Sequence, residues 1–236
     1  PRMLVFSLPF LCEDRTQAER LVNSEFAREI SMDSLKSGAT ILGIGDAGGF
    51  RQFSNSVRMI RRPEDLKGLK MRSNGMDTIN KTLEALGAEV MTVPYNDLYM
   101  ALKSGAIDGQ ENPWVNSSGM RFYEVQKYFT EVNYQFHPEP FYVNTRWYES
   151  LPPEYQEILA ECTEEMMKEN NRLIDENEVQ AMENIRANAE IYTLSREERQ
   201  AFVEATQVVY EEYMDNGLLT MDDLARMKRI IRGEEK

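Results

Sequence analysis

Two arginines and one asparagine have the residue types and positions that best fit a binding site. Arg72 lies near the end of the stretch LKMRS and Asn112 lies at the end of AIDGQEN, and both stretches are predicted strands. Arg51 lies upstream in GGFRQ. A guanidinium group presents a planar fork of N–H donors that binds a carboxylate through two parallel hydrogen bonds. We therefore predict a site for a small carboxylate, although a single arginine is more often a solvated surface residue.

The segment DGQENP concentrates hydrogen-bonding side chains after a predicted helix. Asp108 and Glu111 are close in sequence, but nothing in the pattern marks a nucleophile or a catalytic acid. We interpret them as a hydrogen-bond network at a strand end. Tyr95 follows Pro94 at the end of another predicted strand, where its ring could pack on a ligand. An isolated aromatic residue is more often part of the core.

The overall charge excludes several classes of partner. The formal net charge is −13, which argues against nucleic acid and against anionic lipid surfaces. No apolar run reaches the roughly 18 residues that a membrane span needs. The start of the chain, PRMLVFSLPFLCED, lacks the basic start and the cleavage site of a signal peptide.

The sequence has too few cysteines and histidines, in the wrong spacing, for a metal site or a catalytic triad. The two cysteines, Cys12 and Cys162, lie far apart, and each is predicted to fill a core position rather than to form a disulfide. The single histidine, His137, is interpreted as a loop or pocket-edge residue because Pro138 and Pro140 follow it. We therefore expect no metal site and no serine–histidine–aspartate triad.

The first half of the chain alternates predicted strands and helices. Strands are predicted at 39–45, 69–73, 88–94 and 106–112, with residues 46–60 as loop and strand. Helices are predicted at 14–37, 76–86 and 95–104, with a short helical start at 62–66. This order indicates βαβ units, right-handed crossovers and a parallel sheet. Ligands of such sheets bind outside the carboxyl ends of the strands, where Arg72 and Asn112 lie.

The second half is dominated by one long helix. Residues 122–144 are rich in aromatics, and a strand is predicted at roughly 141–144. A continuous helical pattern over about 153–188 is longer than a small domain is wide, so we expect it to span two lobes. A strand at 190–194 follows. Ser195 and Glu198 form a capping box for the next helix, and a last helix is predicted from 220 to about 231.

A glycine motif leaves a different class of function open. Gly43, Gly45 and Gly48 match GxGxxG after a predicted strand, as in dinucleotide-binding sites. That motif needs a helix to begin within the glycines, and the following GFRQFSNSVRM shows no helical pattern. A nucleotide-dependent or acid–base enzyme remains the alternative to a binding protein. A structural protein built around the long helix is a third hypothesis.

Three segments resemble a known family. RPEDLKGLKMR, VPYNDLYMALKSGAIDGQENP and FYEVQKYFTEVNY resemble, in order and spacing, the substrate-binding subunits of TRAP transporters of the DctP type. LPFLCEDRTQAERLV is similar to the LPFLF segment of that family, whose members carry further residues before it. The resemblance implies an α/β, two-lobed (type II) periplasmic-binding-protein fold with a long lobe-spanning helix, and here an incomplete first lobe.

The resemblance also implies a function and a site. It implies an extracytoplasmic, periplasmic binding protein without cofactor or enzymatic activity, which captures an organic acid and delivers it to TRAP permease subunits. Arg72 matches the arginine that pairs with the ligand carboxylate, Asn112 its asparagine partner, and Arg51 the second arginine. Tyr95 matches a pocket position. Asn74 stands where many members have proline, so we expect it to contact a hydroxyl or a second carboxylate.

The same resemblance implies how the chain divides into lobes. Residues 1–49 and 138–177 are expected to form the remainder of lobe I. Residues 50–137 and 178–236 are expected to form lobe II.

Overall fold

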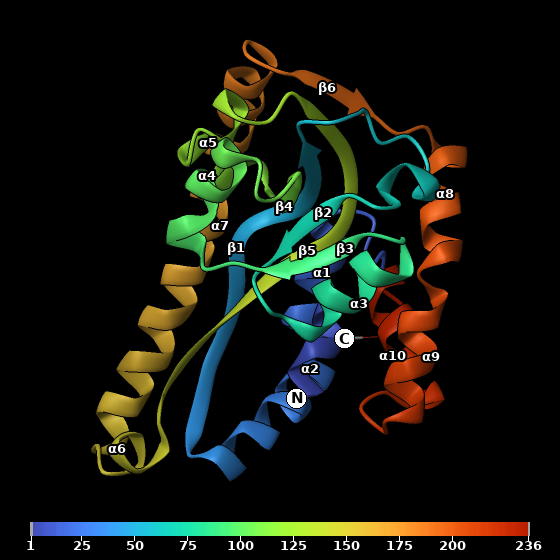
Figure 1. The fold of residues 1–236 in the computed structure, drawn as a ribbon. Coiled ribbons are helices and arrows are strands. Elements are labelled where there is room, and N and C mark those ends of the chain that lie inside the picture. Colours follow the sequence, from blue (N-terminus) through green and yellow to red (C-terminus); the bar gives the residue numbers. More distant parts are fainter. Residues whose placement is uncertain (1, 236) are drawn as a thin grey trace.

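The computed structural model describes residues 2–235, which form a six-stranded mixed sheet flanked by helices (Figure 1). The strands are β1 (Ala39–Asn55), β2 (Lys70–Ser73), β3 (Glu89–Thr92), β4 (Gly109–Pro113), β5 (Tyr128–Asn144) and β6 (Glu190–Thr193). The α-helices are α1 (Arg15–Val22), α2 (Glu25–Met32), α3 (Asp77–Ala85), α4 (Tyr95–Ser104), α5 (Trp114–Gly119), α6 (Thr145–Glu149), α7 (Pro153–Arg186), α8 (Arg196–Ala205), α9 (Gln207–Asp215) and α10 (Met221–Arg232). Short 3₁₀ helices cover Arg2–Ser7, Asp33–Ser37, Pro63–Leu66 and Phe122–Glu124.

The sheet has the strand order β3-β2-β4-β1-β5-β6. Strands β2, β3 and β4 pair in parallel, as the βαβ pattern predicts, and β5 also pairs in parallel with β6. Strand β1, however, runs antiparallel to both of its neighbours, β4 and β5. The prediction of a wholly parallel sheet is therefore wrong, because it treated residues 39–60 as separate short segments.

Strand β1 is continuous through its glycines. Gly48 and Gly49 adopt φ values of 134° and 91°, which produce a bulge opposite β5 instead of ending the strand. The Asp46 carboxylate stabilises this bulge by accepting hydrogen bonds from the backbone N–H groups of Gly48 and Gly49, at 2.8 and 2.5 Å. No helix begins at Gly48, so the geometry that a dinucleotide motif requires is missing here.

Strand β5 is also longer than predicted. It begins at Tyr128 rather than near Phe141, and it pairs with nearly the whole of β1. His137, Pro138 and Pro140 lie within this strand and not in a loop. In Figure 1 the two long strands run side by side from the region of β6 down to the region of α6.

Two predicted helices are interrupted by side chains that hydrogen-bond to the backbone. The helix predicted over 14–37 ends at Val22, and Ser24 starts α2 by accepting a hydrogen bond from the backbone N–H of Ala27. The helix predicted after Ser195 has the expected capping box with Glu198 but breaks at Thr206.

Helix α7 confirms the predicted long helix. Its 34 residues correspond to about 50 Å at 1.5 Å per residue. It packs against β1, where the glycines allow close approach: a Cβ atom on Gly43 would lie 3.2 Å from Thr163 Cγ2. Gly43 and Gly45 therefore serve the packing of a helix on a strand.

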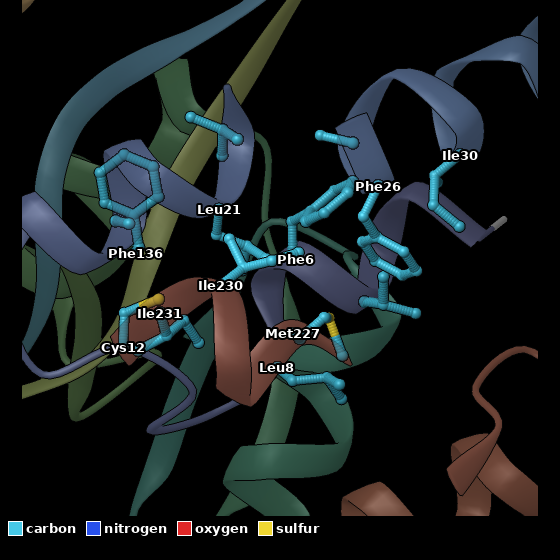
Figure 2. Packing of buried hydrophobic residues seen from close by; sticks show 14 of the residues in the cluster. Phe6, Leu8, Cys12, Leu21, Phe26, Ile30, Phe136, Met227, Ile230 and Ile231 are labelled. Atoms are coloured by element: carbon cyan, nitrogen blue, oxygen red, sulfur yellow. The ribbon is translucent and has the colours of Figure 1, made fainter. Parts of the chain in front are cut away.

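The largest hydrophobic cluster joins the two ends of the chain. Residues from 5–30 pack against residues from 209–231, with Phe136 of β5 beside them (Figure 2). The division into lobes stays a prediction, and α10, which it assigns to lobe II, shares this core with residues 5–30. Cys12 is buried here as predicted, whereas Cys162 is exposed, and both are free.

Candidate functional site

The carboxyl ends of β2 and β4 lie next to each other, as expected for parallel neighbours. Arg72 of β2 pairs with Gln110 of β4, and Asn112 follows two positions later on β4. Arg51 of β1 pairs with Pro113 of the same β4 strand. The sheet therefore brings Arg51, Arg72 and Asn112 to one region, although 61 positions separate Arg51 from Asn112.

Arg72 is held by one hydrogen bond and leaves most of its donors free. Its Nε donates to the carbonyl of Val93 at 2.8 Å, and the residue is only 2% exposed. Within residues 2–235 no acceptor contacts its Nη1 or Nη2 atoms. Burial lowers the pKa of Arg72; the charge of Glu111 acts in the opposite direction, and the nearby Arg51 lowers the pKa further. An arginine nevertheless stays protonated, so this is a buried cation with an unoccupied fork.

Arg51 differs because its fork is already occupied. Its Nε contacts Glu111 Oε2 in a buried ion pair, and its Nη2 donates to Glu111 Oε1 at 2.8 Å. The hydroxyl of Tyr134 donates to the same carboxylate. Burial lowers the pKa of Arg51, but the adjacent Glu111 outweighs this and raises it above its usual value. Arg51 was predicted to bind the ligand carboxylate, but its charge is already neutralised by Glu111.

The remaining donors of Arg51 reach two further side chains. Nη1 lies 3.0 Å from His137 Nδ1, and Nη2 lies 3.3 Å from Asn112 Oδ1. Asn112 in turn donates from Nδ2 to Gln110 Oε1 at 2.5 Å. One hydrogen of Arg51 Nη1 has no acceptor in the described part of the chain. A continuous network therefore connects β1, β4 and β5 beside Arg72.

The structure brings Tyr95 to this group but not Asn74. The Tyr95 ring centroid lies 5.9 Å from the guanidinium carbon of Arg72, and its hydroxyl lies 3.5 Å from the carbonyl of Asn116. Asn74 is exposed, and its Oδ1 accepts a hydrogen bond from the backbone N–H of Met76 at 2.9 Å. Asn74 stabilises the turn before α3, and no hydrogen bond links it to Arg72.

Three residues of the network were not predicted as site residues. Glu111 was expected only in a structural network, which it does form, and Tyr134 was not singled out. His137 was expected in a loop or at a pocket edge; it lies in β5, beside Arg51. Its burial, together with the charge of Arg51, lowers its pKa to about 3, so it is neutral near pH 7. A signal did exist for Glu111, because an acid inside a predicted buried strand needs a cationic partner.

The depressed pKa of His137 makes stability depend on pH. Between about pH 6.5 and pH 3 the unfolded chain binds a proton at this histidine that the folded chain does not, so folded stability falls as pH decreases through that range. We expect His137→Gln, which keeps an acceptor for Arg51, to lose less stability than the parent between pH 7 and pH 5. Urea unfolding at both pH values measures this. An equal loss in both proteins would contradict it.

A separate hollow lies away from this network. A cavity of about 940 Å³ is bordered by α1, α2, the first half of β1 and α7, with Val22, Ile44 and Met167 among its lining residues. None of the residues of the Arg51–Arg72 network lines it. Residues 2–235 contain no cluster of metal ligands, and none of their helices is long and apolar enough to cross a membrane.

Comparison with known proteins identifies the family. The model of the family described as "Bacterial extracellular solute-binding protein, family 7" (DctP) matches residues 1–216. The chain belongs to this family. The resemblance to the DctP family is thereby confirmed.

Relatives of this DctP-family chain are longer than it is. A C4-dicarboxylate-binding periplasmic protein DctP of Vibrio cholerae is 30% identical over 213 residues, which cover 89% of this chain and 63% of the relative. An uncharacterised protein of Haemophilus influenzae is 33% identical over 165 residues, covering 70% of this chain and 50% of the relative. The chain thus corresponds to between half and two thirds of the length of these relatives.

Solved structures share the fold. A TRAP periplasmic solute-binding protein of Shewanella oneidensis with bound succinate has a TM-score of 0.91 and 28% identity, covering 98% of this chain and 75% of that one. A Ralstonia eutropha H16 protein of the same description, with bound (S)-2-acetolactate, has a TM-score of 0.91 and 32% identity with the same coverage. The chain has the α/β fold of these two-lobed binding proteins.

Proposed function

We propose that this protein binds a small organic acid as the solute-binding component of a TRAP transporter. The observation that carries the proposal is the buried fork of Arg72, whose Nη1 and Nη2 atoms contact no acceptor in residues 2–235. A buried cation of this kind is costly unless an anion pairs with it. A ligand carboxylate supplies that anion and accepts two parallel hydrogen bonds.

The proposed site consists of Arg72, Asn112 and Tyr95, with Arg51 beside them. Asn112 and the free Nη1 hydrogen of Arg51 supply polar contacts, and the Tyr95 ring covers the guanidinium group of Arg72. Asn74 is not included in the proposed site, because its side chain accepts a hydrogen bond that stabilises a turn. The bound acids of the similar structures, succinate and acetolactate, support the ligand class.

Binding would act on a conformational equilibrium. In the proposed mechanism the solute bridges groups of the two lobes and shifts a hinge equilibrium towards a closed form. A charge-assisted hydrogen bond contributes about 1.5–3 kcal/mol, whereas micromolar affinity needs about 8 kcal/mol. Arg72 therefore acts with several other contacts. The closed form would deliver the solute to membrane permease subunits, and the periplasmic relatives support an extracytoplasmic location.

A thermal-shift screen tests the proposed function. We expect some members of a panel of hydroxy, keto and sugar acids to raise the unfolding temperature of the full-length protein, because a ligand that binds only the folded state stabilises it by mass action. Matched neutral compounds, such as the corresponding amides or alcohols, should give no shift. A panel in which no acid stabilises the protein more than its neutral analogue would contradict the proposal.

The comparisons offer no support for the enzyme alternative. The glycine motif that suggested a nucleotide lies inside β1, and the family is described as solute-binding. We therefore propose a receptor without catalytic activity.

A further inference from the structure

We infer that Gln110 is a positioning residue, which acts on the ligand through Asn112. This inference rests on the proposed function, in which Asn112 contacts the carboxylate of the solute. A carboxylate only accepts hydrogen bonds, so Asn112 can contact it only through the N–H groups of its amide. The side chains around Asn112 decide which way that amide faces.

Asn112 belongs to a row of four buried polar side chains. Gln126, Ser54, Gln110 and Asn112 are each at most 4% exposed. Ser54 of β1 lies opposite Gln110 of β4 in the antiparallel register, and Asn112 follows two positions later. Hydrogen bonds therefore connect Gln126, through this row, to Arg51 beside the proposed site.

The direction of these hydrogen bonds is fixed at the Gln126 end of the row. Gln126 Nε2 donates to the backbone carbonyls of Asp108 and Val125, at 3.2 and 3.0 Å. The amide oxygen of Gln126 must therefore face Ser54, whose hydroxyl lies 3.2 Å away. The single hydroxyl hydrogen of Ser54 is used in this contact, so towards Gln110 this hydroxyl can only accept.

The same direction continues to Asn112. Gln110 Nε2 donates to Ser54 Oγ at 2.7 Å, which leaves Gln110 Oε1 to face Asn112. Asn112 Nδ2 donates to that oxygen at 2.5 Å. At the other end of the row Arg51, which can only donate, donates from Nη2 to Asn112 Oδ1 at 3.3 Å. Both ends of the row thus require the same orientation of the Asn112 amide.

An amide held in this orientation offers an N–H group to the ligand. Nδ2 carries two hydrogens, so Asn112 can donate to Gln110 and to a ligand oxygen at the same time. Rotating the amide by half a turn would set its nitrogen against Arg51 and its oxygen against Gln110 Oε1, and buried groups would lose two hydrogen bonds.

The contact with Gln110 is the shorter of the two that hold the amide. Without it, Asn112 keeps the longer contact with Arg51, and the last torsion angle of an asparagine side chain is only weakly restricted by its own geometry. The ligand would then have to order the amide on binding, which weakens affinity. Gln110 therefore contributes to affinity by holding a donor in place before the ligand arrives.

A double-mutant cycle between Gln110 and Asn112 tests this role. Gln110→Met keeps a side chain of similar length without the amide. In the full-length protein we expect it to weaken the binding of the best acid from the screen by about tenfold. The Asn112→Ala variant should itself bind about tenfold more weakly or worse. In that background Gln110→Met should change the affinity by less than about twofold, because the residue that it positions is absent. Calorimetry gives the four dissociation constants.

Two further variants accompany the cycle. Gln200→Met makes the same change at an exposed position of α8, where Gln200 contacts Glu204, and it should bind like the parent. Ser54→Ala removes one oxygen and breaks the row one link before Gln110. It should weaken binding by about threefold, again only while Asn112 is present, and it replaces Gln110→Met in the cycle if that variant does not fold. Circular dichroism and an unfolding curve establish which variants are folded.

The outcomes separate this inference from the proposed function. A loss of affinity that depends on Asn112 supports both. A loss of equal size with and without Asn112 means that Gln110 only stabilises β4, and it overturns the inference. Unchanged affinity in Gln110→Met or in Asn112→Ala overturns it as well, and in each of these cases the proposed function stands on Arg72. Absence of binding by every acid of the panel overturns both.

Discussion

Replacing Arg72 with alanine is expected to weaken the binding of a small carboxylate by about 100-fold or more, since two charge-assisted hydrogen bonds to the ligand are lost. The fold should survive. The substitution leaves the carbonyl of Val93 without the Nε donor, which destabilises the protein, but it also removes a buried charge that has no counter-ion of its own. These two effects offset each other. Calorimetry with the best acid from the screen measures the affinity, and an unfolding curve measures the stability.

Two matched variants show whether the fork or the charge matters. Arg72→Lys keeps the charge but cannot form two parallel hydrogen bonds, and it should bind weakly. Arg62→Ala changes the net charge by the same amount at an exposed position, where the arginine pairs with Asp65, and it should bind like the parent. Unchanged affinity in Arg72→Ala would refute the role assigned to this residue.

Replacing Glu111 with alanine is expected to cost about 3–5 kcal/mol of folding stability. The substitution removes the counter-ion of Arg51, whose guanidinium is buried, and it leaves the hydroxyl of Tyr134 without its acceptor. Urea unfolding at pH 7 measures the loss. As a control, Glu190→Ala breaks an exposed pair with Lys127 in the same sheet, and it should cost about 1 kcal/mol or less.

A triple variant separates the net contribution of the buried network to folding stability from the destabilisation caused by removing one member alone. Arg51→Met, Glu111→Leu and Tyr134→Phe together remove every charge and hydroxyl of the buried group while keeping similar volumes. Replacing a buried ion pair by apolar residues is often close to neutral, so the triple variant should be more stable than Glu111→Ala alone. If Glu111→Ala unfolds no more easily than Glu190→Ala, the ion pair does not hold β1 and β4 together as we describe.

Local patterns in the sequence predicted the parts of the fold that depend on local interactions. The long helix, the capping box of Ser195 and the helix predicted over 95–104 all arise from residues close in the chain. The meeting of Arg72 and Asn112 was also predictable, since the carboxyl ends of parallel neighbours share one edge of a sheet. The family resemblance added the function, which these patterns alone left open.

The features that were missed depend on pairing between distant segments. In the sequence the glycines around Gly48 suggest that the strand ends there. Only the pairing with β5 shows that the strand continues. The partnership of Arg51 with Glu111 requires the antiparallel register of β1 on β4, which places Arg51 opposite Pro113. No spacing rule links two residues 60 positions apart. The loop that the prolines suggested for His137 is wrong for the same reason, because only pairing with β1 shows that these residues continue a strand.

The core that joins the two ends of the chain has a consequence for biosynthesis. The hydroxyl of Tyr210 hydrogen-bonds to the carbonyl of Pro9, 201 positions earlier, and α10 packs against α1. A growing polypeptide therefore leaves the apolar sides of α1 and α2 uncovered until α10 has been translated. Contacts of such high sequence separation form slowly and leave intermediates prone to aggregation. This core is complete only once residues 221–231 have been synthesised, and nascent chains stalled before residue 221 should need protection by a chaperone.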